Sequence, residues 1–161
     1  MKTKKPPQNN NLKIIKDITK DLLEHLDIKS TKIAVLEDEA KITQINIDCN
    51  ENHQAMLIGY RGETISSLQL IISLMAYKQT GEWQKLVVNI GQYRQQREES
   101  LKKLALNSAQ KVKFSGEEVI LPKLNAAERR IIHLTLADSL DVKTESIGEG
   151  SERTLVIKPK K

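Results

Sequence analysis

The tetrapeptide Gly59-Tyr60-Arg61-Gly62 most constrains how this chain can fold, because it separates two segments with helical patterns. Residues 52–58 predict a short helix, and apolar residues recur at spacings of three and four between Ile65 and Met75, as on the buried face of a second helix. The tetrapeptide must therefore form a tight turn between two helices. Because glycine lacks a Cβ atom, such a turn can adopt backbone angles that are closed to other residues.

The same turn has the chemistry of a phosphate site. Without Cβ atoms a phosphate can approach the main-chain amides, and the second helix begins near Gly62 with free N–H groups and the positive end of its dipole. Arg61 can add a charge-assisted hydrogen bond, and Tyr60 can stack on a base. A plain junction with glycine ending the first helix also accounts for the string. The flanking elements must decide between the two.

Those flanking elements predict a small α+β domain over residues 12–92. Apolar residues at helical spacing predict a helix from Leu12 to Leu26, and branched residues predict strands at 32–36, 41–49 and 83–90. The order is helix, strand, strand, helix, helix, strand. This order resembles a type II KH domain, in which a GXXG loop clamps the backbone of about four nucleotides. The resemblance implies that Gly59, Tyr60, Arg61 and Gly62 bind nucleic acid.

The resemblance also implies an apolar groove for the bases. Its candidate lining residues are equally suited to the core of the domain, and we assign most of them there: Ile45, Ile47, Ile58 and Ile65. Five aromatic residues in the whole chain are too few for a broad stacking platform of the kind that RNA-recognition motifs use.

A basic stretch follows this domain. From Lys85 to Gly116, seven basic residues stand against two acidic ones, and apolar residues at helical spacing predict one long amphipathic helix over residues 93–115. Its Arg94, Arg97 and Lys102 are candidates for secondary nucleic-acid contacts. A basic helix face is often only solvated, but this one connects two candidate binding elements.

Net charge gives little support to nucleic-acid binding. The formal charge of +5 arises from six lysines close to the two ends, and residues 6–157 hold 20 basic and 21 acidic side chains. We expect residues 1–11 and 159–161 to be polar or basic tails, the first of them disordered. The relevant electrostatic feature is therefore the local concentration of charge on residues 93–115.

The second motif lies in a short C-terminal unit, residues 116–158. Asn125 and Glu128 predict the capping box of a helix, on which Arg129 and His133 are four residues apart and share a face, with Arg130 beside them. Arginine pairs with phosphate and stacks on bases, and imidazole can stack or form a hydrogen bond. The alternative is structural: Arg129 pairs with Glu128 or a neighbour, and His133 is a half-buried helix residue.

Strands are predicted around this helix at 118–121, 142–147 and 154–157. The strings Asn-Ala-Ala-Glu-Arg-Arg-Ile-Ile-His from residue 125 and Gly-Glu-Gly-Ser-Glu-Arg from residue 148 are similar to an R-three-H domain, named for its Arg-x-x-x-His spacing. Such a small unit buries little surface, so we expect it to depend on the basic helix for stability. The complete fold class is α+β, a type II-like KH domain joined by a long basic helix to a small α/β R-three-H domain.

This ordered pair of domains resembles the bacterial Jag family, also called KhpB or EloR. Family members commonly begin with a Jag-N domain, whereas ten residues precede the first KH helix here. The resemblance implies a non-catalytic, single-stranded RNA-binding protein in post-transcriptional control of cell elongation or envelope growth. It also implies association with a small KH-only protein or with itself. Two alternatives stay open: a protein scaffold with a KH fold, and a binder of single-stranded DNA.

The rest of the sequence gives no indication of a catalytic, metal or cofactor site. Three histidines, His25, His53 and His133, lie on separate predicted elements, and neither a zinc-ligand set nor a phosphate-binding motif of nucleotide enzymes occurs. The single cysteine, Cys49, agrees with a reducing compartment, and without an apolar run of membrane length we expect a cytoplasmic protein. We expect aspartate at both Gly59 and Gly62 to remove most RNA affinity while leaving the fold intact.

Overall fold

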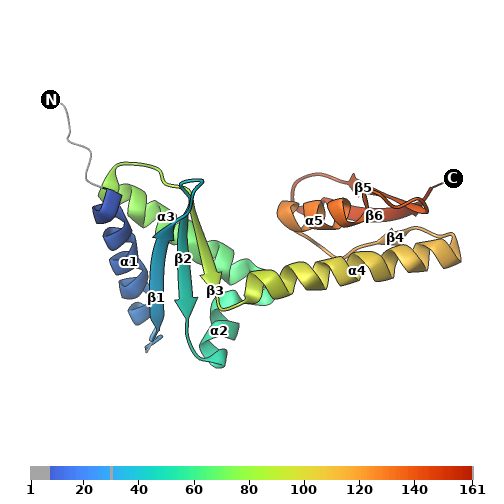
Figure 1. Cartoon of the computed structure of the whole chain (residues 1–161). Helices are drawn as coiled ribbons and strands as arrows, with labels where there is room; N and C mark the ends of the chain where they lie inside the picture. The colour runs from blue at the N-terminus through green and yellow to red at the C-terminus, as the bar shows by residue number, and fades with distance from the viewer. Residues whose placement is uncertain (1–7, 30, 161) are drawn as a thin grey trace. The chain divides into compact units, whose positions relative to one another are not determined.

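The computed structural model describes residues 8–29 and 31–160, which form two compact units. The first unit ends at Arg94, and the second begins at Gln95. Both combine helices with a small three-stranded sheet, so the α+β class is confirmed (Figure 1). The helix that was predicted to join the domains, α4 (Tyr93–Ser115), contributes its first two residues to the first unit and the rest to the second.

The first unit has the element order expected for a KH domain. Its elements are α1 (Gln8–His25), β1 (Lys32–Glu37), β2 (Thr43–Asp48), α2 (Glu51–Ile58), the 3-10 turn η1 (Tyr60–Gly62), α3 (Glu63–Thr80) and β3 (Leu86–Ile90). β2 is the central strand, antiparallel to β1 and parallel to β3. The parallel pair is possible because two helices and the turn between them connect β2 to β3.

Packing in this unit places one face of the sheet against helices. Along β2, buried and more exposed residues alternate, and the buried side chains of β2 and β3 join those of α1 and α3 in one core. Ile45, Ile47 and Ile65 are buried members of this core, and Ile58 packs against it while partly buried. Their assignment to the core is therefore confirmed.

The second unit has its own core, to which α4 contributes. Its further elements are β4 (Val119–Ile120), α5 (Ala126–Leu136), β5 (Val142–Ile147), η2 (Gly150–Glu152) and β6 (Thr154–Pro159). β6 lies between β4 and β5, and both pairs are antiparallel. Leu101, Ala105 and Val112 of α4 are buried together with side chains of α5, β5 and β6. Helix α4 is thus a structural part of this unit, as we expected because the unit is small.

The element boundaries differ from the sequence predictions at several points. Helix α1 begins at Gln8, so residues 8–11, expected in the tail, are helical. Strand β6 runs through Pro159 because it pairs with Val142, and the Lys160 N–H donates to the Asp141 carbonyl at 2.8 Å. The other residues of the expected tails, 1–7 and 161, lie outside the described residues. Strand β3 begins at Leu86 rather than residue 83.

Across residues 8–29 and 31–160, the helices are too short or too polar to cross a membrane. Cys49 follows β2 directly and is buried as a free thiol, and this burial raises the pKa of the thiol.

Replacing Leu101 by alanine tests whether α4 is part of the second core. Leu101 is 1% exposed, so Leu101→Ala should lower the free energy of unfolding of this unit by about 2–5 kcal/mol through lost packing and a residual cavity. Leu106, on the same helix, is 53% exposed, and Leu106→Ala should change it by less than about 0.5 kcal/mol. The free energy of unfolding of both variants is measured in urea, with amide exchange of β6 as the probe. Equal effects of the two changes would contradict the packing role of α4.

Candidate nucleic-acid interface

The GXXG loop, Gly59 to Gly62, joins α2 and α3 through backbone angles that favour glycine. Helix α2 begins at its cap Asn50, whose side chain accepts the His53 N–H at 2.9 Å, and ends where the Gly59 N–H donates to the Ala55 carbonyl. Gly59 has φ +67° and ψ −170°, and Gly62 is left-handed with φ +84°. No described side chain caps the start of α3. The Gly62 N–H donates to the Gly59 carbonyl at 3.5 Å, and the Glu63 N–H donates to the Tyr60 carbonyl. These two amides are therefore already paired, whereas the sequence predicted free N–H groups at the start of this helix.

Both glycines also have close neighbours. A Cβ atom on Gly59 would lie 1.9 Å from Thr64 Oγ1, and one on Gly62 would lie 2.9 Å from Tyr93 Oη. Either contact forces Thr64 or Tyr93 to move, in addition to the backbone strain. Aspartate at both glycines should therefore destabilise the fold, in contrast to the expectation from the sequence that it would leave the fold intact. The two central positions are the ones at which the loop can be changed.

The central residues face solvent. Tyr60 is 68% exposed, and the Arg61 guanidinium carbon lies 5.0 Å from the centroid of its ring, as in a cation–π pair. Arg61 has φ +50°, a left-handed conformation that costs a non-glycine residue about 1–2 kcal/mol. The loop thus presents one aromatic ring and one cation beside the start of α3.

The first two residues of α4 pack against the KH unit, and one of them lies beside the GXXG loop. Tyr93 packs partly buried against the first core and lies next to Gly62. Arg94 donates from Nε and Nη2 to the Val88 carbonyl, both at 3.2 Å, and from Nη2 to Gln69 Oε1 at 3.3 Å. Burial lowers the pKa of Arg94 from its ordinary high value. Arg94, a predicted secondary contact, is therefore turned toward β3 and α3.

The second site is built on the first turns of α5. Asn125 Oδ1 accepts the Glu128 N–H, and Glu128 Oε2 accepts the Asn125 N–H, each at 2.9 Å, so the predicted capping box is confirmed. Arg129 donates from Nη1 to the Leu124 carbonyl at 2.7 Å. Its partner is thus a carbonyl, and the carboxylate of Glu128 is held by Arg97 instead.

The Arg/His face, Arg129, Arg130 and His133, is presented by one side of α5. Arg130 and His133 are exposed, and Arg129 is half-buried. Two contacts that the sequence did not indicate orient this face. His133 Nδ1 lies 2.6 Å from Thr144 Oγ1 on β5, and Arg129 Nη1 is 3.4 Å from the Arg153 carbonyl. Thr144 lies 11 positions after His133, and Arg153 lies 24 positions after Arg129, so linear spacing could not reveal these contacts.

Helix α4 shows much less unsatisfied charge than its sequence suggested. Arg97 is bound to Glu128, Lys102 to Glu98 at 2.6 Å, and Lys113 to Asp141 at 2.8 Å. Of the three predicted secondary contacts, Arg94 is exposed but bonded to β3 and α3, Arg97 is partly buried and bonded to Glu128, and Lys102 is half-exposed.

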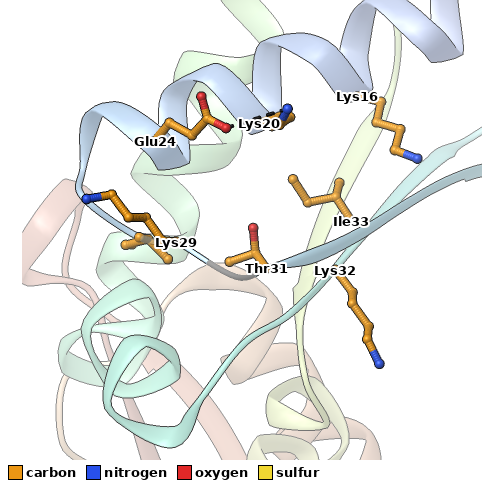
Figure 2. Close-up of a pocket in the computed structure, with 8 residues that line it drawn as sticks. Lys16, Lys20, Glu24, Lys29, Thr31, Lys32 and Ile33 are labelled. Atoms are coloured by element: carbon orange, nitrogen blue, oxygen red, sulfur yellow. Dashed lines mark ion pairs between the residues drawn. The ribbon is translucent and has the colours of Figure 1, made fainter.

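A separate pocket of about 680 Å³ lies between α1 and β1 and is lined by several lysines (Figure 2). Lys20 pairs with Glu24 at 3.6 Å, and Lys29 pairs with Asp27 at 2.6 Å. Lys32 points away from α1 and is the cross-strand partner of Asp48. Because Glu24 and Asp27 pair with two of the pocket's lysines, the pocket is a weaker candidate for an anionic ligand than the GXXG loop.

The fold and the two sites define a class, a protein with a KH domain followed by an R-three-H domain. Comparison with protein families agrees: residues 13–90 match the KH domain of KhpA and KhpB, and residues 99–159 match the R-three-H domain. The chain therefore belongs to the KhpB/Jag family.

Its relatives include three proteins named RNA-binding protein KhpB. Those of Clostridium symbiosum and Bacillus subtilis are each 36% identical, over 118 and 109 residues. These matches cover 73% and 66% of this chain and 53% and 52% of the relatives. The protein of Lactiplantibacillus plantarum is 32% identical over 113 residues, or 70% of this chain and 34% of the relative. The chain thus spans about half the length of the first two relatives.

Alanine at Gly59 tests the geometry of the loop. Gly59→Ala should lower the free energy of unfolding of the KH unit by about 1–3 kcal/mol from backbone strain alone, with more from the clash with Thr64. Gly81 has a similar φ of +72° but open space around it, so Gly81→Ala should cost only about 1–2 kcal/mol. Urea unfolding measures both. A Gly59 variant at least as stable as the Gly81 variant would contradict the described packing of Thr64.

Proposed function

We propose that this protein binds single-stranded RNA without catalysing a reaction, through the GXXG loop and the Arg/His face. The observation that carries the proposal is the exposed pair Tyr60 and Arg61 beside the start of α3. The names of the relatives support RNA as the ligand. Membership of a family with KH and R-three-H domains supports two binding elements on one chain.

At the GXXG loop, the backbone of about four nucleotides would pass along the tetrapeptide. The positive end of the α3 dipole stabilises one phosphate, and Arg61 neutralises a neighbouring one. Tyr60 supplies a face for one unpaired base. An unpaired strand fits this arrangement, since stacking on Tyr60 requires a base that is free of its partner.

At the Arg/His face, Arg130 provides the most accessible charge for phosphate. His133 is held through Nδ1 by Thr144, which fixes the ring so that Nε2 can meet a base or sugar. Arg129 shares its guanidinium with two carbonyls and contributes the remaining donors. Lys102 is a secondary contact in this proposal, and we assign Arg94 and Arg97 to structural support.

Family membership extends the proposal to a role in the cell. We place the protein in the cytoplasm, in post-transcriptional control linked to cell elongation or envelope growth. A free, buried Cys49 agrees with a reducing compartment. Among the described residues, no three His, Cys, Asp or Glu side chains gather as a metal site would require, and the proposal uses neither a metal nor a cofactor.

The KH unit also carries a surface suited to a protein partner. An apolar stripe lies on the exposed side of α3 at helical spacing, with side chains 44–57% exposed: Leu70, Ile71, Leu74 and Tyr77. Trp83 extends it through an edge-to-face contact with Tyr77 at 5.4 Å between ring centroids. We propose that this stripe binds a small KH-only protein or a second copy of this chain, because contiguous exposed apolar side chains mark interaction sites.

Aspartate at both central loop positions tests RNA binding. Tyr60→Asp with Arg61→Asp should weaken binding of a short single-stranded RNA more than about tenfold, since a stacking face and a cation are replaced by repulsion. A matched control is Ala40→Asp with Lys41→Asp. These residues are exposed in the β1–β2 turn, Lys41 also has positive φ, and the charge change is identical. The control should lose less than about threefold.

Binding is measured by fluorescence anisotropy at several salt concentrations, with single-stranded DNA and duplex RNA as comparison ligands. Equal losses in the loop variant and the turn variant would show a mere charge effect and contradict the loop as the site. Equal affinity for DNA and RNA would favour the alternative of a DNA binder.

One aspartate on α3 tests the partner surface. Leu74→Asp places a charge in the apolar stripe and should weaken self-association in sedimentation, or capture of a KH-only protein after nuclease treatment, by more than about tenfold. Gln79→Asp adds the same charge on the same helix at an exposed position outside the stripe. Association that survives Leu74→Asp as well as it survives Gln79→Asp would rule out this surface.

A further inference from the structure

One carboxylate joins α4 to the start of α5. Glu128 is 7% exposed, and its two oxygens have different partners. Oε2 accepts the Asn125 N–H at 2.9 Å, and Oε1 accepts Arg97 Nε at 2.8 Å and lies 2.7 Å from Arg97 Nη2. The Arg97 side chain is itself 25% exposed. The sequence placed Arg97 among nucleic-acid contacts, and it precedes the residues that match the R-three-H domain.

This geometry directs two donors of Arg97 away from a ligand. A phosphate would have to compete with a nearly buried carboxylate for the same guanidinium, and a buried carboxylate that loses its cation is strongly destabilised. Lys102 differs in this respect, because its ion pair with Glu98 is half-exposed and costs little to open. Arg97 is therefore better suited to hold Glu128 than to bind RNA.

The position of Glu128 sets the Arg/His face. Arg129 and Arg130 follow it directly in the first turns of α5, and His133 lies one turn further on. If Glu128 moves outward to water, the capping bond to Asn125 and the start of the helix move with it. Arg129, tied to the Leu124 carbonyl ahead of the helix, would shift as well.

We propose that Arg97 is a positioning residue of the RNA site on α5, acting through Glu128 rather than through contact with RNA. The inference rests on the proposed function and extends it to a residue outside the Arg/His face. It makes a specific demand on double variants, because the harm of losing Arg97 arises from the carboxylate left behind. Removing the charge of Glu128 as well should repair the site.

The test uses the full chain and a short single-stranded RNA. Arg97→Met keeps the bulk of the stem and should weaken RNA binding about tenfold, while the slope of log affinity against log salt stays unchanged because no phosphate contact is lost. Glu128→Gln retains an oxygen for the capping bond. The double variant Arg97→Met with Glu128→Gln should recover most of the affinity. Arg130→Ala, in contrast, should reduce the salt slope by about 0.7.

Two further variants complete the design. Lys113 and Asp141 form an exposed ion pair at 2.8 Å between α4 and the segment before β5, so Lys113→Met should change affinity less than about twofold. Arg97→Lys keeps the charge while losing the two-donor geometry, and should bind about threefold more weakly. It serves in place of Arg97→Met if that variant does not fold.

The results separate this inference from the proposed function. A reduced salt slope in the Arg97 variant without rescue by Glu128→Gln would show that Arg97 contacts phosphate, and would overturn the inference. If the wild-type chain binds no RNA, the proposed function fails. Amide hydrogen exchange then still tests whether the Arg97–Glu128 pair positions the start of α5. Faster exchange at residues 129–133 in Arg97→Met, restored in the double variant, supports positioning of this face, whereas unchanged exchange overturns it.

Discussion

Both halves of this protein depend on helix α4, since each half uses a different part of it. Tyr93 and Arg94 at its start complete the KH unit, one beside Gly62 and the other on the Val88 carbonyl. Leu101 and the following apolar side chains complete the core of the second unit, and Arg97 holds the carboxylate of Glu128. The helix therefore supports the two units through packing and partly buried hydrogen bonds more than through its positive charge.

Local patterns predicted the parts of the fold that depend on local physics. Helical spacing, the two glycines and the capping box at Asn125 gave the element order, the GXXG turn and the start of α5, because each arises from residues a few positions apart. The parallel pairing of β2 with β3 was not predicted, because strand pairing depends on contacts between segments far apart in the sequence. Charge patterning was less informative, since the chemistry of a basic side chain does not show whether it faces water or a carboxylate.

The residues that linear reasoning missed all act across long separations. Arg97 reaches Glu128 over 31 positions, and Thr144 meets His133 from the neighbouring strand over 11. Position 62 favours glycine for two reasons: its φ is positive, and the Tyr93 side chain lies where a Cβ atom would be. The second reason cannot be read from the sequence of the turn. These contacts explain why the arginines of the predicted sites fall into different roles. Arg61 and Arg130 are exposed, whereas Arg94 and Arg97 bind other groups of the protein.

Under the proposed function, a single RNA strand contacts two sites on one chain, and the second contact becomes intramolecular once the first has formed. The most direct measurement is a titration of the isotope-labelled chain with a short single-stranded RNA, followed by amide chemical shifts. The account predicts that the largest changes fall at residues 59–66 and 129–133. It is contradicted if saturating RNA leaves both segments unchanged while shifts gather elsewhere, for example at the pocket between α1 and β1.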